Sequence, residues 1–409
     1  MAAVNIDELA TPAVLIDRAR AQRNIDRMQA AADARGVRLR PHTKTHKSPI
    51  VAGWQIERGA IGICCAKLGE AEVFAQALRR RSGQAGQPDI RVPYPLNPAN
   101  ADRVIALLEH TTLSFIVDHP VVARQWSEAM VRAGTQVDVL VKVDVGFHRC
   151  GIDPAGAGAV DMIKGVAALP GLRLRGLLAH AGHAYHAHSE DELRRMAEGE
   201  ARTLRDLVAR CRTAGITIDE VSAGATPPAR FSLQEDGFTE YRPGNYVYFD
   251  RTQVALGAAT LDDCALTVLA RVVSKPAADR IILDAGSKTL TNDGARGFAP
   301  APGYGTVLRW TGGHSLLAHR SATREGGSGG QYLSGIEVPV ADDQLLIERL
   351  SEEHATVRVT NGSTGLEPGD LVRIVPNHSC VVSNLVDQAW LVDGDTVEPL
   401  PIAARGRIT

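Results

Sequence analysis

The sequence is poor in aromatic residues and carries almost no net charge. Phe, Trp and Tyr make up only 4% of the 409 residues, and the formal net charge at pH 7 is −2. Proteins that bind nucleic acid usually present a basic surface, often with aromatic side chains on which bases stack. The composition therefore argues against nucleic acid, and against an anionic membrane surface, as a partner.

No apolar run is long enough to cross a membrane, and residues 1–8 lack the basic and apolar regions of a secretory signal. The six cysteines show no Cys-x-x-Cys spacing, whereas small secreted domains held by disulfides are dense in cysteine. We therefore expect a cytoplasmic protein with reduced thiols. A length of 409 residues suffices for a large core and two domains.

Short apolar runs alternate with amphipathic stretches between residues 18 and 250. The strand candidates are residues 37–40, 60–65, 90–93, 113–117, 137–143, 172–179, 218–222 and 241–249. About eight βα units in this span predict an α/β fold, a (β/α)8 TIM-type barrel. A doubly wound sheet is the alternative, but no Gly-x-Gly-x-x-Gly motif follows the first strand.

After residue 250 the pattern changes to strands with few helices between them. The candidates are residues 266–273, 280–283, 355–359, 371–375 and 390–392, and the turn signals Asn-Gly, Gly-Asp and Asp-Gly stand among them. This predicts a C-terminal, mainly β domain, made of residues 1–17 and 251–409. Within it, residues 294–348 are rich in Gly, Pro and Ser and predict a surface loop or lid.

Two lysines and two histidines crowd into residues 41–47 (PHTKTHK), directly after the first barrel strand. In α/β barrels, loops in this position form the active-site rim. A lysine among other cations, or desolvated in a pocket, can act as a neutral amine nucleophile and form a Schiff base with a carbonyl cofactor. Taken alone, the same residues also fit a solvated basic loop or a phosphate-binding patch.

Two further loops follow predicted strands. Arg149 lies in the charged loop after residues 137–143, where a guanidinium could bond a phenolate or carboxylate oxygen or form a surface ion pair. Residues 180–188 contain four histidines, among them His180 and His183. Such a cluster offers general bases or metal ligands, with a chance surface cluster as the alternative.

Small residues close the last two predicted barrel strands. Gly224, Ala225 and Thr226 follow the seventh, and Gly244 and Asn245 stand in the eighth unit. Exposed backbone N–H groups at such turns form anion-binding nests, and loops after strands seven and eight are the usual phosphate site of a barrel.

The β domain contributes a possible metal motif, His378-Ser379-Cys380. On an extended segment, residues two apart point the same way, toward one ion. Imidazole and thiolate suit Zn²⁺ best among the common divalent metals. A His-x-Cys pair is common, however, and by itself identifies nothing.

Taken together, these motifs resemble the D-threonine aldolase / D-serine dehydratase family, pyridoxal-phosphate enzymes related to alanine racemase. The resemblance extends over nearly the whole chain and also includes residues 11–17, 62–65, 144–151, 243–246 and 282–286. Each of these motifs alone is unspecific, but jointly they are specific.

The resemblance implies a role for each candidate residue. Lys44 would hold pyridoxal 5'-phosphate as a Schiff base, and Arg149 would approach the ring oxygen of the cofactor. The turns at Gly224, Ala225 and Thr226 and at Gly244 and Asn245 would hold its phosphate. His378 and Cys380 would bind a divalent metal (Zn²⁺, Mn²⁺ or Mg²⁺) that holds the 3-hydroxyl of the substrate. His180 and His183 are the candidate catalytic bases.

The implied activity is that of a lyase on D-configured β-hydroxy amino acids. We favour a D-threonine aldolase, which cleaves its substrate to glycine and an aldehyde. The grounds are the overall resemblance, the similarity of Asn384-Leu385 to the aldolase sequences, and the histidine-rich loop at residues 180–188, which offers a base for the β-hydroxyl. Cys380 instead resembles the dehydratases, so elimination of water from D-serine or D-threo-3-hydroxyaspartate is the alternative. A non-catalytic pyridoxal-phosphate-binding protein and a structural zinc protein are more remote possibilities. The resemblance also predicts a homodimer.

Overall fold

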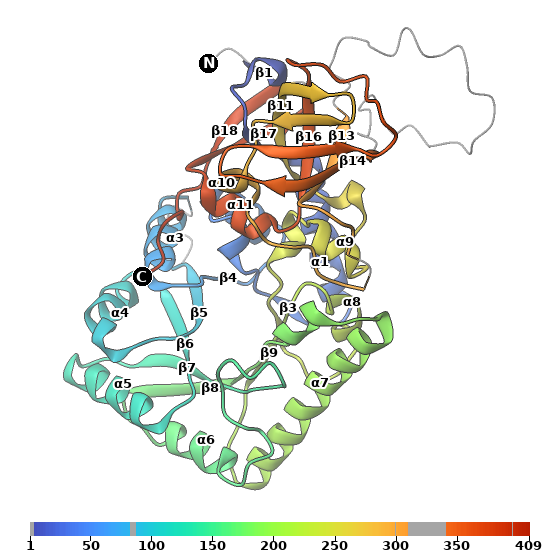
Figure 1. Cartoon of the computed structure of the whole chain (residues 1–409). Helices are drawn as coiled ribbons and strands as arrows, with labels where there is room; N and C mark the ends of the chain where they lie inside the picture. The colour runs from blue at the N-terminus through green and yellow to red at the C-terminus, as the bar shows by residue number, and fades with distance from the viewer. Residues whose placement is uncertain (1–3, 82–86, 299, 310–340, 395) are drawn as a thin grey trace.

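The structure is a computed structural model that describes residues 4–81, 87–298, 300–309, 341–394 and 396–409. Its strands form two sheets, one of eight strands and one of ten, at opposite ends of the molecule (Figure 1). No helix among the described residues is both long and apolar enough to span a membrane.

The eight-stranded sheet is parallel throughout, in the order β3-β10-β9-β8-β7-β6-β5-β4. Its strands are β3 (Arg38–Leu39), β4 (Ile63–Cys64), β5 (Asp89–Pro95), β6 (Thr112–Val117), β7 (Val137–Lys142), β8 (Leu172–Leu178), β9 (Glu220–Ala223) and β10 (Glu240–Tyr241). The two ends of the sheet meet at a parallel bridge between His42 and Cys64. The sheet therefore closes into the predicted (β/α)8 TIM-type barrel.

Helices alternate with these strands and surround them (Figure 1). They are α1 (Arg18–Asp33), α2 (Pro49–Glu57), α3 (Leu68–Arg81), α4 (Ala101–Leu108), α5 (Pro120–Arg132), α6 (Ala159–Ala167), α7 (Glu190–Thr213), α8 (Ala229–Ser232) and α9 (Arg251–Ala255). Helix α1 begins after Asp17, whose carboxylate accepts a hydrogen bond from Arg20 N at 2.9 Å. Gly36 follows the helix with φ +63°, a conformation that glycine adopts readily.

The ten-stranded sheet contains strands from both ends of the chain. They are β1 (Val4–Asn5), β2 (Ala13–Asp17), β11 (Leu266–Ala277), β12 (Arg280–Leu283), β13 (Gly305–Arg309), β14 (Ala341–Leu350), β15 (Ala355–Val359), β16 (Leu371–Pro376), β17 (Gln388–Asp393) and β18 (Thr396–Pro401). Two short helices, α10 (Ser287–Leu290) and α11 (Ser379–Leu385), accompany the sheet. Strand β2 pairs with β11 and β17, so the N-terminal segment belongs to this sheet. The fold class is thus the predicted one, and we keep the domain boundaries (18–250; 1–17 and 251–409) as a proposal.

Short 3₁₀ helices lie at several strand ends: η1 (Ile6–Glu8), η2 (Thr43–Thr45), η3 (Pro98–Asn100), η4 (Gly182–His186), η5 (Asn245–Val247) and η6 (Leu261–Asp263). One of them corrects a prediction. Residues 241–249 were expected to form one strand, but β10 ends at Tyr241 and η5 follows. The reason is Pro243, which cannot donate a hydrogen bond to a sheet.

The predicted loop over residues 294–348 is wrong at both ends. Gly305–Arg309 and Ala341–Leu350 are the strands β13 and β14, and they pair with each other. Residues 310–340, which include the Gly-rich stretch, lie outside the described part of the chain. The Gly, Pro and Ser content of residues 294–348 predicted a loop that was too long. Leu345 and Ile347 are buried in the β domain and alternate with more exposed residues, which is the pattern of a strand.

A buried ion-pair cluster fills part of the barrel interior. Glu240 on β10 accepts hydrogen bonds from Arg40 and from Arg91 on β5, and Arg91 also bonds Glu220 on β9 at 2.7 Å. Glu240 is fully buried. Burial opposes its ionisation, but the guanidinium groups of Arg40 and Arg91 outweigh this and lower the pKa of Glu240 from 4.5 to about 2. The cluster thus links strands that are not neighbours in the sheet.

We predict that Glu240→Gln lowers the free energy of unfolding by about 3–5 kcal/mol at pH 7, because two buried guanidinium groups each lose one carboxylate partner and keep only Asp89 or Glu220. Urea denaturation measures this, with Glu128→Gln on the exposed face of α5 as the matched control. The folded-state pKa is depressed, so this stabilisation is complete above pH 4.5 and declines as the pH falls toward 2. A wild-type stability at pH 7 in Glu240→Gln would contradict the prediction.

Candidate active site

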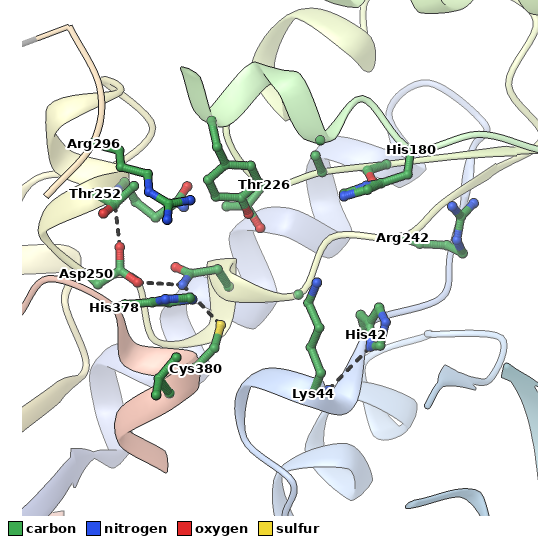
Figure 2. Close-up of a pocket in the computed structure, with 18 of the residues that line it drawn as sticks. His42, Lys44, His180, Thr226, Arg242, Asp250, Thr252, Arg296, His378 and Cys380 are labelled. Atoms are coloured by element: carbon green, nitrogen blue, oxygen red, sulfur yellow. Dashed lines mark hydrogen bonds between the residues drawn. The ribbon is translucent and has the colours of Figure 1, made fainter. Parts of the chain in front are cut away.

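A cavity of about 490 Å³ lies where the C-terminal ends of the barrel strands face the β domain. Its walls come from the loops after β3, β7, β8, β9 and β10, together with residues 293–296 and 378–384 of the β domain. Figure 2 shows side chains from both parts pointing into this space. The volume is in the range of small-molecule sites, and the location is where barrel enzymes carry their active sites.

Lys44 lies in η2, at the barrel side of the cavity (Figure 2). His42 fixes the start of this turn, since its Nδ1 accepts a hydrogen bond from Lys44 N at 3.3 Å. Thr43 Oγ1 donates to Cys64 O at 2.9 Å and ties the turn to β4. Lys47 also lines the cavity, but its Nζ is paired with Glu70 at 2.8 Å. Within the described residues Lys44 makes no ion pair, so its amine is available to a ligand.

The loop after β8 brings one of the two predicted bases to the cavity. His180 lines it, whereas His183 is not among its lining residues and lies beside Gly146. Tyr185 and His186 of the same loop, which were not singled out from the sequence, do line it. A histidine cluster predicts that the loop is functional, but only the course of η4 decides which side chains face inward.

The protonation state of His180 follows from its contacts. Its Nδ1 lies 2.7 Å from Gly224 O. Because a carbonyl oxygen can only accept, Nδ1 carries the proton and Nε2 is left as an acceptor. Burial, reinforced by the charge of Lys44, lowers the pKa of His180 well below its usual value, so the imidazole is neutral. The Nε2 atom of this neutral imidazole can accept a hydrogen bond from a ligand in the cavity.

Cations other than Lys44 also face the cavity. Arg149 lines it, as predicted, and its guanidinium lies 5.1 Å from the ring centre of Phe147. Lys142 and Arg242 were missed. Burial and the charge of Arg242 lower the pKa of Lys142 to about 8. Two features of the sequence could have identified them: Lys142 is a charged residue at the end of an apolar strand, and Arg242 directly precedes Pro243.

The turns predicted to hold a phosphate lie side by side. Tyr246 N donates to Thr226 Oγ1 at 3.2 Å and so joins the two turns. No hydrogen bond is present for the backbone N–H groups of Gly224, Thr226 and Gly244 within the described structure. A Cβ atom at Gly224 would lie 2.5 Å from Arg242 N, so the turn needs glycine there. Free N–H groups at a cavity wall suit an oxyanion such as a phosphate.

Ala225 and Asn245 complete these two turns. The hydroxyl of Tyr241 donates to Ala225 O at 2.8 Å and fixes the first turn. The side chain of Asn245 donates through Nδ2 to Asp250 at 2.6 Å and contacts Cys380 Sγ at 3.5 Å. The side chain of Asn245 therefore supports the metal motif, while its backbone belongs to the turn.

The metal motif lies at the start of a helix, so the prediction of an extended segment is wrong. His378 is the residue before α11 and Cys380 is in its first turn. Both still line the cavity, because the backbone turns into the helix at Ser379, whose N–H is held by Asp250 at 3.0 Å. Cys380 Sγ lies 3.2 Å from Thr45 Oγ1, next to Lys44. Lys44 and the His-x-Cys pair therefore line one cavity.

The donors fit a divalent metal. His378 Nδ1 is bonded to Asp293 Oδ2 at 2.6 Å, which leaves Nε2 for an ion, as is usual for metal-binding histidines. Burial opposes the charge on His378, but Cys380, Asp250 and Asp293 together raise its pKa to about 10. Within the described part of the chain no cluster of three or more His, Cys, Asp or Glu side chains has metal-binding geometry. Two donors, His378 and Cys380, would leave the other coordination positions to water or substrate.

We predict that Cys380 is the fastest-alkylated of the cavity and core thiols in chelator-treated protein. Burial disfavours its thiolate, but His378 and Lys44 outweigh this and lower the pKa of Cys380, while burial raises the pKa of Cys64 to about 11. Iodoacetamide labelling at pH 7.5, read for each peptide by mass spectrometry, tests this. His378→Asn should slow labelling of Cys380, and added Zn²⁺ should protect it. Equal labelling of Cys380 and Cys64 would refute the prediction.

Two family models match the chain. "Alanine racemase, N-terminal domain" matches residues 16–252, and "Putative serine dehydratase domain" matches residues 265–392. The first covers the barrel and the second most of the β domain.

Characterised relatives match over nearly the full chain. The D-threonine aldolase of Arthrobacter sp. is 32% identical over 403 residues, covering 97% of this chain and 93% of the relative. The D-threo-3-hydroxyaspartate dehydratase of Delftia sp. (strain HT23) is 33% identical over 387 residues, covering 91% of each.

Solved structures of the same two kinds of enzyme are also similar to this chain. The structure of the Delftia dehydratase has a TM-score of 0.82 at 28% identity and covers 97% of this chain and 98% of its own. D-threonine aldolase from Filomicrobium marinum has a TM-score of 0.81 at 26% identity and covers 100% and 99%. The chain therefore belongs to the alanine-racemase-like family that contains the D-threonine aldolases and the D-serine and D-threo-3-hydroxyaspartate dehydratases.

Proposed function

We propose that the protein is a lyase that acts on D-configured β-hydroxy amino acids with pyridoxal phosphate and a divalent metal, and that it is a D-threonine aldolase. One observation carries the proposal. A lysine amine, a set of free backbone N–H groups and a His-x-Cys pair line the same cavity at the C-terminal end of a barrel.

The residues present fit pyridoxal phosphate. The free N–H groups of Gly224, Thr226 and Gly244 offer a place for its phosphate, and the Lys44 amine can hold its aldehyde carbon. Arg149 is the candidate partner of its ring oxygen. When bound, the cofactor supplies an electron sink for the bonds of the substrate Cα.

His378 and Cys380 would hold the metal, which as a Lewis acid would polarise the β-hydroxyl of a substrate. Support comes from two solved forms of the Delftia dehydratase. One is a cysteine-to-alanine mutant in the metal-free form, and the other is a histidine-to-alanine mutant, with the two substituted positions two residues apart. His378 and Cys380 have the same spacing.

The residues of the cavity can perform the proton transfers of aldol cleavage. Breaking the Cα–Cβ bond requires removal of the proton from the β-hydroxyl. His180 is neutral, and its Nε2 is free to accept because Nδ1 is bonded to Gly224 O. The position of His183 outside the cavity lining makes His180 our single candidate for this role.

Dehydration is the second candidate, and Cys380 favours it through its similarity to the dehydratase motif. In that reaction Lys44 would take the α-proton, and hydroxide would leave from Cβ. The bond to be broken must stand perpendicular to the cofactor plane, so the orientation of the substrate chooses between the two reactions. The predicted homodimer also remains a proposal, because a single chain is described.

We predict that Lys44→Ala abolishes the near-visible absorbance of the holoprotein and lowers activity on the order of 10⁴-fold or more, since the cofactor loses its covalent attachment. Borohydride reduction followed by peptide mapping should place the cofactor on Lys44. Lys67→Ala, outside the cavity, is the control and should keep both properties. Labelling of Lys47 or Lys67 would show that the assignment is incorrect.

The reaction itself is tested by its products. We expect D-threonine and D-threo-phenylserine to yield glycine and an aldehyde, and the L-enantiomers at Cα to yield nothing. His180→Gln should reduce aldol cleavage by about 10²–10⁴-fold, the usual contribution of a general base. Ammonia and a 2-oxo acid as the main products would reject the aldolase and establish the dehydratase.

A further inference from the structure

The cationic side chains of the cavity differ in whether they already bind a partner within the protein. Lys47 is paired with Glu70, and Arg242 donates to Ala179 O at 2.6 Å and to Ala223 O at 3.2 Å. Lys142 donates to Val143 O at 3.1 Å. These three side chains are held by the protein itself.

Arg296 is in a different position. It lines the cavity from the β domain, and within the described residues its guanidinium makes no hydrogen bond and no ion pair. Figure 2 shows it on the same side of the cavity as Asp250 and His378, with its guanidinium directed toward the interior. Arg296 is exposed, so solvent is the alternative partner of its guanidinium, and a planar guanidinium at the edge of a ligand cavity is suited to bind a carboxylate.

The segment that carries Arg296 is anchored at both ends. Asp293 O accepts from Asn377 Nδ2 at 2.9 Å, and Asp293 Oδ2 is bonded to His378 Nδ1 at 2.6 Å. Phe298 N donates to Ala255 O at 3.1 Å, and its side chain packs against the apolar cluster beside η4. Arg296 is therefore held three residues from the carboxylate that orients His378.

This connection places Arg296 beside one particular part of a substrate. If His378 and Cys380 hold the ion that binds the β-hydroxyl, then Cβ and its remaining substituent lie at that side of the cavity. We propose that Arg296 is a specificity-determining residue that binds a carboxylate on Cβ, so that the preferred substrates are β-hydroxy-D-amino acids with an acidic side chain. The inference rests on the proposed lyase activity on β-hydroxy-D-amino acids, and within that substrate class it ranks acidic side chains above the methyl group of D-threonine.

The test compares D-threo-3-hydroxyaspartate with D-threonine on the holoenzyme, scoring loss of substrate whichever products form. The wild type should have the higher kcat/KM on the dicarboxylate. Arg296→Gln should lower that value by about 10- to 100-fold, the range for a lost hydrogen bond to a charged group, and change the value for D-threonine by less than about 3-fold. The β-carboxylate does not change during the reaction, so the loss should appear in KM.

Two variants serve as controls. Arg296→Lys keeps the charge without the planar fork and should retain part of the preference. Arg132→Gln, on the exposed end of α5, should leave both substrates unaffected. An equal loss on both substrates would assign Arg296 to the α-carboxylate or to structure, and would overturn the inference. So would an unchanged substrate ratio in Arg296→Gln.

The same experiment distinguishes failure of this inference from failure of the proposed function. Turnover of D-threonine with no preference for the dicarboxylate would leave the proposed function standing and reject the inference. Absence of turnover on both substrates would reject the proposed function. Calorimetric titration of D-threo-3-hydroxyaspartate into wild type and Arg296→Gln would then judge the inference by itself, and equal affinities would overturn it.

Discussion

The fully buried carboxylate of Asp250 joins the barrel to the β domain at the cavity. It accepts hydrogen bonds from Asn245 Nδ2 at 2.6 Å, from Gln253 N at 3.0 Å and from Ser379 N at 3.0 Å. Burial raises its pKa, and a carboxylate so far from water is stable only when several donors surround it. The last barrel turn, the start of α9 and the start of α11 thus share one anchor.

This anchor explains why two chemically different groups meet. Thr45, next to Lys44, contacts Cys380 at 3.2 Å, although the two residues are far apart in the sequence. The lysine belongs to a barrel loop and the thiol to a helix of the β domain. Their joint place in the wall of one cavity brings the amine, the thiol and His378 to the same binding space.

Much of the fold is predictable because it depends on local patterns. Apolar runs alternating with amphipathic stretches marked every barrel strand, and they did so because a parallel barrel buries its strands on both faces. The prediction failed in two places, once because it passed over a proline and once because pairing between distant segments overrode the local composition. Pro243 and Gly244 broke the expected last strand, and β13 and β14 exist through pairing with β16 and β15. Pairing between distant segments leaves little trace in composition.

The candidate site, like the fold, was predictable in part. The sequence by itself determined which residue types stand at the strand ends: Lys44 among cations, glycines at the turns, and a histidine and a cysteine two residues apart. Only the tertiary structure decided that His180 lines the cavity while His183 does not, that Lys142 and Arg242 join the site, and that Arg296 enters it with no partner among the described residues. The physical reason is that a residue's identity fixes its chemistry, whereas its direction and its neighbours follow from the packing of segments that lie far apart in the chain.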